Sequence, residues 1–79
     1  MTTYQFESLK RTADRLFKDG VSSTTFARLL NYDYELYCKQ TITTNDDFYR
    51  MNSESNAPMR ELLNKLGYCY TTFGICRLN

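Results

Sequence analysis

The sequence predicts a small α+β domain in which two N-terminal helices and a short third helix pack on a small antiparallel sheet. A mostly α fold is the alternative. Three observations support the α+β prediction. Apolar residues recur every three or four positions between residues 4 and 39, as on one face of a helix. A shorter stretch with the same spacing follows Pro58, and residues 68–77 are rich in the Tyr, Thr, Phe and Ile that favour strands.

The first predicted helix spans residues 4–19. Its apolar side chains fall on one stripe, whereas Lys, Arg and Asp occupy the positions between them. Gly20 follows, and glycine adopts the left-handed conformation that ends many helices without steric cost. The stripe consists of Phe6, Leu9, Ala13, Leu16 and Phe17.

The second predicted helix spans residues 24–39, with Ser22 or Ser23 as its N-cap. A break near Asn31, which would give two shorter helices, is the alternative. The apolar stripe of this helix consists of Phe26, Leu29, Leu30, Tyr34 and Tyr37. The contact between the two helices is expected to be made by Leu16, Phe17, Leu29 and Leu30.

The remaining predicted elements are shorter. Residues 47–52 are expected to form a strand, and residues 57–66 a helix that Gly67 ends. Residues 68–77 are expected to form a final strand, in which Gly74 marks a bulge or a turn. The predicted order is therefore helix, helix, strand, helix, strand.

Length and charge limit the number of domains and the classes of partner that the protein can have. The 79 residues are enough for one domain, residues 1–79. The formal net charge is only +1 and no run of Lys or Arg occurs, so we expect no nucleic-acid partner. No apolar stretch approaches the roughly 20 residues that cross a bilayer, and the N-terminus lacks the layout of a signal peptide. We therefore expect a cytoplasmic protein without a membrane partner.

The cysteines give no sign of a metal site. Cys38, Cys69 and Cys76 have no repeated spacing, and the chain contains no histidine. We therefore predict neither a metal nor another cofactor. Free thiols that pack as small hydrophobic side chains are expected, and one disulfide between two of the three stays open.

One segment resembles a known family. Asn52–Tyr68 contains a helix-forming stretch that closes with Leu-Gly-Tyr, and it resembles the C-terminal motif of the GNAT superfamily of N-acetyltransferases. The resemblance implies an acetyl-CoA site between this helix and the strand before Ser53, with Asn56 holding the pantetheine arm. The matching residues are Asn56, Pro58, Met59, Leu62, Lys65, Leu66, Gly67 and Tyr68.

Two departures from the pattern of that family argue against activity. The pyrophosphate loop of the family needs a close pair of glycines, and Gly20, Gly67 and Gly74 do not form one. The tyrosine that serves as general acid in many members is replaced here by Leu63. We therefore predict that the protein is not an enzyme, with a degenerate or split acetyltransferase as an alternative.

Residues 9–40 also fit a helix-turn-helix motif of three short helices. The candidate recognition helix carries Asp33 and Glu35, with Lys39 as its only cation, so it would repel DNA phosphates. A plain helix hairpin is favoured, and a small DNA-binding regulator is the second alternative.

The seven tyrosines are more than so small a domain can bury with satisfied hydroxyl groups. Exposed Tyr is common at the centres of protein interfaces, because it buries a large area at low entropic cost. We predict a non-enzymatic protein that binds a protein partner or a second copy of itself as a homodimer. Small proteins of this kind are frequent among the phage and plasmid proteins that inhibit host machinery, and by analogy with them we expect an inhibitor. The predicted contact residues are Tyr34, Tyr37, Tyr49 and Tyr70.

Overall fold

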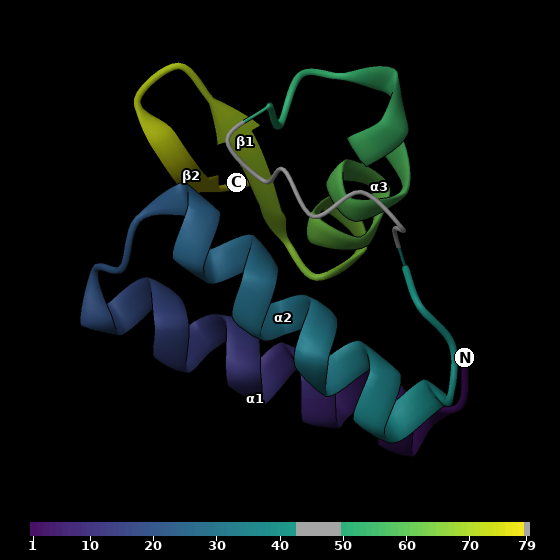
Figure 1. The fold of residues 1–79 in the computed structure, drawn as a ribbon. Helices are drawn as coiled ribbons and strands as arrows, with labels where there is room; N and C mark the ends of the chain where they lie inside the picture. Colours follow the sequence, from purple (N-terminus) through teal and green to yellow (C-terminus); the bar gives the residue numbers. More distant parts are fainter. Residues whose placement is uncertain (43–49, 79) are drawn as a thin grey trace.

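The computed structural model describes residues 1–42 and 50–78, which form an α+β fold. Helices α1 and α2 lie side by side, and α3 and a two-stranded hairpin cover one side of the pair (Figure 1). The elements are α1 (Thr3–Asp19), α2 (Ser23–Cys38), the 3-10 turn η1 (Glu54–Asn56), α3 (Ala57–Lys65), β1 (Tyr68–Thr71) and β2 (Gly74–Arg77).

Local hydrogen bonds fix the ends of α1. The Thr2 hydroxyl accepts a bond from the Gln5 amide at 3.1 Å, and the Gln5 side chain accepts one from the Thr2 amide at 2.8 Å. This reciprocal pair is a capping box, and it starts the helix one residue before the predicted position. At the other end Gly20 has a φ of 70°, which confirms its predicted role as the helix stop.

Helix α2 begins at the predicted cap. The Ser22 hydroxyl accepts a hydrogen bond from the Thr25 amide at 3.2 Å. The helix then continues without a break through Asn31, which confirms the prediction of one helix. Residues 32–40 therefore do not form the separate third helix of the helix-turn-helix interpretation.

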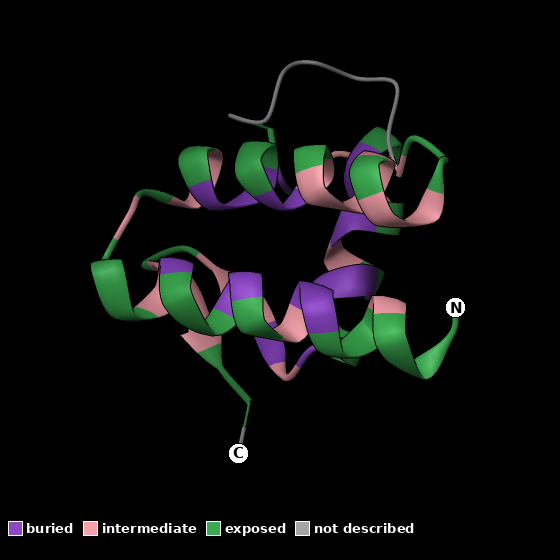
Figure 2. Ribbon diagram, turned by 90° about the horizontal axis from the view of Figure 1, so that it is seen from below, coloured by how far each residue is buried: buried purple, intermediate pink, exposed green. Residues whose placement is uncertain are grey.

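The core lies between the α1–α2 pair and the layer formed by α3 and β1. The inward faces of the helices are buried and their outward faces are exposed (Figure 2). The buried hydrophobic side chains are Leu9, Ala13, Leu16, Phe26, Ala27, Leu30, Met51, Met59, Leu62, Leu63, Leu66 and Tyr68.

The predicted helix–helix contact is correct in part. Leu16 and Leu30 are buried, and Phe17 packs against the core from its edge. Leu29, however, is 40% exposed, so its assignment to the core is wrong. Adjacent residues point about 100° apart around a helix, and in α2 it is Leu30 that points into the core while Leu29 points toward solvent.

In the described part of the chain, the sheet consists of one antiparallel hairpin that follows α3. Tyr68 pairs with Arg77 and Tyr70 with Ile75, and the turn lies at Thr72 and Phe73. The one strand predicted for residues 68–77 is therefore two strands, with Gly74 at the start of the second.

The strand predicted before α3 is not observed in the described residues. Residues 50–52 belong to a turn rather than to a strand, and the rest of the predicted strand lies outside the described residues. The Arg60 guanidinium donates to the carbonyl groups of Met51 and Ser53, which holds this turn against α3. Within residues 1–42 and 50–78, no helix is both long and apolar enough to cross a membrane.

Candidate functional site

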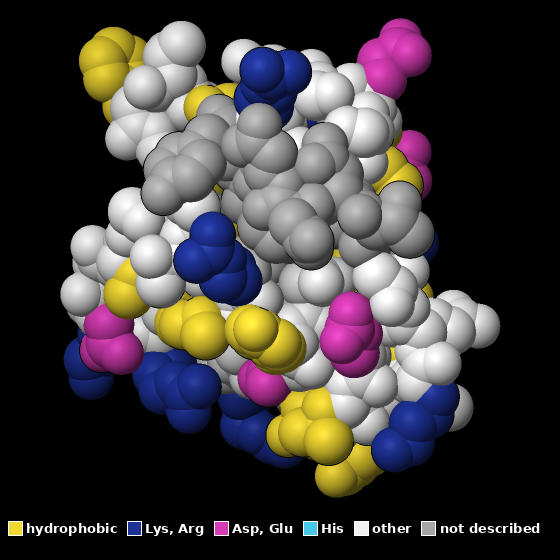
Figure 3. Space-filling view, viewed as in Figure 1, with side chains coloured by type: hydrophobic (Ala, Val, Ile, Leu, Met, Phe, Trp, Pro, Cys, Tyr) yellow, Lys and Arg dark blue, Asp and Glu magenta, His cyan; other side chains and the backbone are white. Residues whose placement is uncertain are grey.

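The outer face of α2 carries an apolar stripe that no described part of the chain covers. It consists of Leu29, Tyr32 and Leu36, whose side chains are 40%, 62% and 60% exposed. Their spacing of three and four residues places them on one face of the helix, away from the core residues of α2. We call these three residues the α2 stripe. In Figure 3 a band of hydrophobic side chains crosses the region of α2, with Lys and Arg side chains below it over α1.

Exposed cations surround the α2 stripe. On α1 they share one face of the helix, since Arg15 follows Arg11 by four residues and Lys18 follows Arg15 by three. Arg15 lies one turn beyond Thr12, which contacts Asp33 of α2. Arg28 lies on the flank of α2 away from Asp33, and Lys39 follows the last residue of the helix. We call this set of exposed side chains the cationic rim: Arg11, Arg15 and Lys18 on α1, and Arg28 and Lys39 at α2.

The acidic residues closest to the α2 stripe are already engaged within the chain. The Asp33 carboxylate accepts a hydrogen bond from the Thr12 hydroxyl at 2.5 Å. The Glu35 carboxylate accepts one from the Thr41 hydroxyl at 3.1 Å. Both carboxylates are half-buried, whereas the cationic rim is exposed. The surface offered to a partner therefore combines an apolar centre with an excess of positive charge, because the five cations of the rim outnumber the carboxylates of Asp33, Glu35 and the exposed Asp19.

The predicted contact tyrosines lie elsewhere. Tyr34, Tyr37 and Tyr70 are half-buried and pack against the core, so only part of each ring is open to a partner, and their role as contact residues stays a prediction. The Tyr37 ring meets the Tyr4 ring edge to face at 6.1 Å. Tyr49 lies outside the described residues.

The sequence contained a signal for the α2 stripe. Apolar residues on α2 follow two separate helical stripes, and only one can face the core. Tyr34 and Tyr37 share the face of Leu30, because they follow it by four and seven residues. Tyr32 and Leu36, together with Leu29, fall on a different face, about 100–160° around the helix from Leu30.

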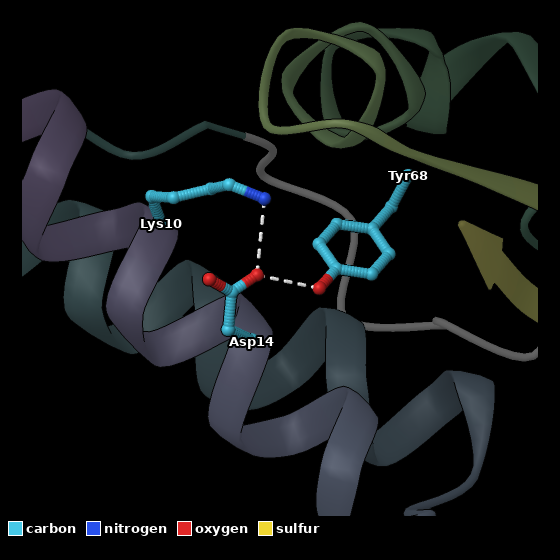
Figure 4. A network of polar contacts seen from close by, with 3 residues as sticks. All are labelled: Lys10, Asp14 and Tyr68. Atoms are coloured by element: carbon cyan, nitrogen blue, oxygen red, sulfur yellow. Dashed lines mark hydrogen bonds and ion pairs between the residues drawn. The ribbon is translucent and has the colours of Figure 1, made fainter. Parts of the chain in front are cut away.

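A polar cluster joins β1 to α1 (Figure 4). The hydroxyl of the buried Tyr68 donates to the Asp14 carboxylate at 2.6 Å, and the Lys10 ammonium binds the same oxygen at 3.0 Å. The Tyr68 bond is the main cause that lowers the pKa of Asp14, and Lys10 adds to it against the opposing effect of burial. Burial, and then the bond to Asp14, raise the pKa of Tyr68 above 10.0. The three side chains are hydrogen-bonded to one another, so the cluster stabilises the contact between β1 and α1.

This cluster makes stability depend on pH at both extremes. The lowered pKa of Asp14 stabilises the fold above the ordinary Asp value near 4, and that contribution disappears as pH falls through the folded-state pKa. The raised pKa of Tyr68 stabilises the fold below about pH 10, and this contribution disappears as pH rises through the folded-state pKa. Urea titrations across pH should show both losses, and Tyr68→Phe should reduce both. Identical profiles for the two proteins would contradict this role.

The residues of the acetyltransferase-like segment serve the fold. Asn56 is buried, and its side-chain amide donates to the Arg50 carbonyl at 2.8 Å, which fastens the turn before α3. Leu63, at the position of the family's general acid, is buried in the core. The resemblance itself stays a prediction.

The structure also contains a shallow hollow beside the start of α1. It has a volume of about 490 Å³, and its charged side chains, Glu7 and Lys65, are both exposed. Among the described residues, no three His, Cys, Asp or Glu side chains are grouped so as to hold a metal ion. Comparisons with protein families, curated proteins and solved structures gave no match.

Proposed function

We propose that this protein is a non-enzymatic binding module that docks a partner protein on the α2 stripe. The single observation that carries the proposal is the second apolar face of α2, Leu29, Tyr32 and Leu36, which remains exposed although the first face fills the core. Burying one such side chain contributes about 1.5–3 kcal/mol. A spacing of i, i+3 and i+7 is also the one by which helices anchor in protein interfaces.

The charges around the α2 stripe define the partner. The cationic rim favours a segment with Asp and Glu beside its apolar residues, because opposite charges guide the encounter and reject wrong partners. We therefore assign the surface to an acidic amphipathic helix of another protein. A second copy of this chain would present the same cationic rim, so self-association would bring like charges together.

This mode of binding agrees with an inhibitory role. A protein of 79 residues that covers an acidic helix on a larger protein would occlude whatever that helix normally contacts. Inhibition of host machinery by a protein of phage or plasmid type is one setting for such an activity, by analogy of class. Neither step requires a catalytic group.

A peptide display library tests the proposal without a known partner. The library contains amphipathic helical peptides whose flanking positions vary among Asp, Glu, Gln, Lys and Arg. The wild-type protein should enrich peptides with acidic flanks, and their affinity should fall as salt screens the cationic rim. The double variant with Tyr32→Ala and Leu36→Ala should not enrich them, because it lacks most of the α2 stripe.

Three outcomes would overturn the proposal. Equal enrichment by the wild type and the double variant would exclude the α2 stripe as the binding site for the peptides. Enrichment of basic or uncharged flanks would exclude an acidic partner. A homodimer with a dissociation constant below about 10 μM in analytical ultracentrifugation, abolished in the double variant, would make a second copy the occupant.

A further inference from the structure

The hairpin places two of the three cysteines directly opposite each other. Cys69 on β1 pairs with Cys76 on β2 in the antiparallel register. Opposite residues in an antiparallel pair project from the same face of the sheet, and successive residues alternate between faces. Since Tyr70 and Ile75 pack against the core, the two thiols lie on the other face. Both are free and half-buried.

We propose that Cys69 and Cys76 form a reversible disulfide, which makes the outer face of the hairpin a redox modification site. The inference is independent of the α2 stripe. It rests on the register of the two strands and on the separation that this register imposes on the two thiols.

The separation follows from the hydrogen-bond pattern. The Leu78 amide donates to the Gly67 carbonyl at 2.8 Å, so these two residues form a hydrogen-bonded pair. Hydrogen-bonded and non-hydrogen-bonded pairs alternate along an antiparallel ladder, so Cys69 and Cys76, two residues further along, are also hydrogen-bonded. Such pairs have Cα atoms about 5.5 Å apart, inside the range of about 4.4–6.8 Å that a disulfide spans.

The same geometry makes the bond labile. The Cβ atoms of a hydrogen-bonded cross-strand pair lie about 5.5 Å apart, whereas a relaxed disulfide holds them at about 3.8 Å. The hairpin must therefore tighten locally when the bond forms. A strained and partly exposed disulfide is reduced more readily than a structural one, which is the behaviour of regulatory disulfides.

Cys38 lies too far from the hairpin to form a disulfide with Cys69 or Cys76. The hairpin meets α2 near its start, where the Tyr68 and Phe26 rings lie 5.7 Å apart. Cys38 is the last residue of α2, and the twelve-residue separation from Phe26 corresponds to about 18 Å along a helix. The three cysteines therefore consist of one pair, Cys69 and Cys76, and one isolated thiol, Cys38.

Oxidised glutathione can drive the reaction in two balanced steps. The thiolate of one cysteine attacks the glutathione disulfide, forms a mixed disulfide and releases one glutathione thiolate. The thiolate of the second cysteine then attacks the protein sulfur of the mixed disulfide and releases the other glutathione. Two protein thiols are oxidised, and one glutathione disulfide is reduced to two thiols.

The experiment equilibrates the protein with mixtures of reduced and oxidised glutathione, followed by acid quenching and mass spectrometry. The wild type and Cys38→Ser should each lose two hydrogen atoms, with peptide mapping that joins Cys69 to Cys76. Excess reduced glutathione should reverse the change. Cys69→Ser and Cys76→Ser should retain one glutathione instead, because the resolving thiol is absent. Circular dichroism verifies that each variant keeps its helices.

Several results would overturn the inference. The wild type could accumulate glutathione on both hairpin cysteines without an internal bond. The mapped bond could include Cys38. The internal bond could also resist excess reduced glutathione, which would make it a structural disulfide rather than a reversible one.

Discussion

Replacing Tyr68 with alanine is expected to lower the free energy of unfolding by about 3–5 kcal/mol, as truncation of a buried aromatic ring does. The Tyr68 ring lies 5.2 Å from the Phe17 ring and 5.7 Å from the Phe26 ring, so it joins the hairpin to both long helices. Its hydroxyl also anchors Asp14. A domain of this length has only about 4–12 kcal/mol of stability in total. Urea denaturation followed by circular dichroism measures the loss.

The matched control is Tyr68→Phe, which keeps the ring and removes the hydroxyl. Its cost should be about 1 kcal/mol, because Asp14 is half exposed and water can replace the lost hydrogen bond. Equal losses for the two variants would show that the ring does not hold the core together.

Replacing Tyr32 with alanine is expected to weaken binding of the acidic peptides by about 2 kcal/mol, or roughly 30-fold, and to leave stability within about 0.5 kcal/mol. The Tyr32 ring lies at the centre of the α2 stripe and is 62% exposed, so its truncation opens no cavity in the core. Fluorescence anisotropy with a labelled peptide measures the affinity, and thermal unfolding measures the stability.

Phe73→Ala provides the matched control for this prediction. Phe73 is 96% exposed at the hairpin turn, away from the α2 stripe, so it also removes one exposed aromatic ring. Its affinity should equal that of the wild type. Equal weakening by both variants would indicate nonspecific attraction to exposed rings rather than a defined site.

Local signals in the sequence predicted the helices well. Apolar periodicity identified α1, α2 and α3, and the C-terminal end of α1 and the N-terminal end of α2 followed from Gly20 and Ser22, whose effects act within a few residues. The side of α2 that meets the core could not be predicted in this way. Leu29 and Leu30 are equally apolar, and only the packing of α3 and β1 against α2 distinguishes them.

The α2 stripe and the cysteine pair could not be predicted from the sequence either, because both depend on contacts between residues far apart in the chain. The number of tyrosines indicated that some rings are exposed, but the identification of Tyr32 rather than Tyr34 requires the orientation of α2. The opposition of Cys69 and Cys76 requires the turn to lie at residues 72–73. The composition of residues 68–77 predicted strand, and Gly74 alone did not fix that turn.

Chemical-shift mapping of the amides in isotope-labelled protein tests the central claim most directly. Adding a peptide with acidic flanks from the display library should shift amides on the outer face of α2, residues 25–36, and those of Arg11 and Arg15 on α1. The hairpin amides should stay unchanged. Shifts confined to the hairpin, or to the hollow lined by Phe6 and Lys65, would contradict the assignment of the α2 stripe as the protein-binding surface.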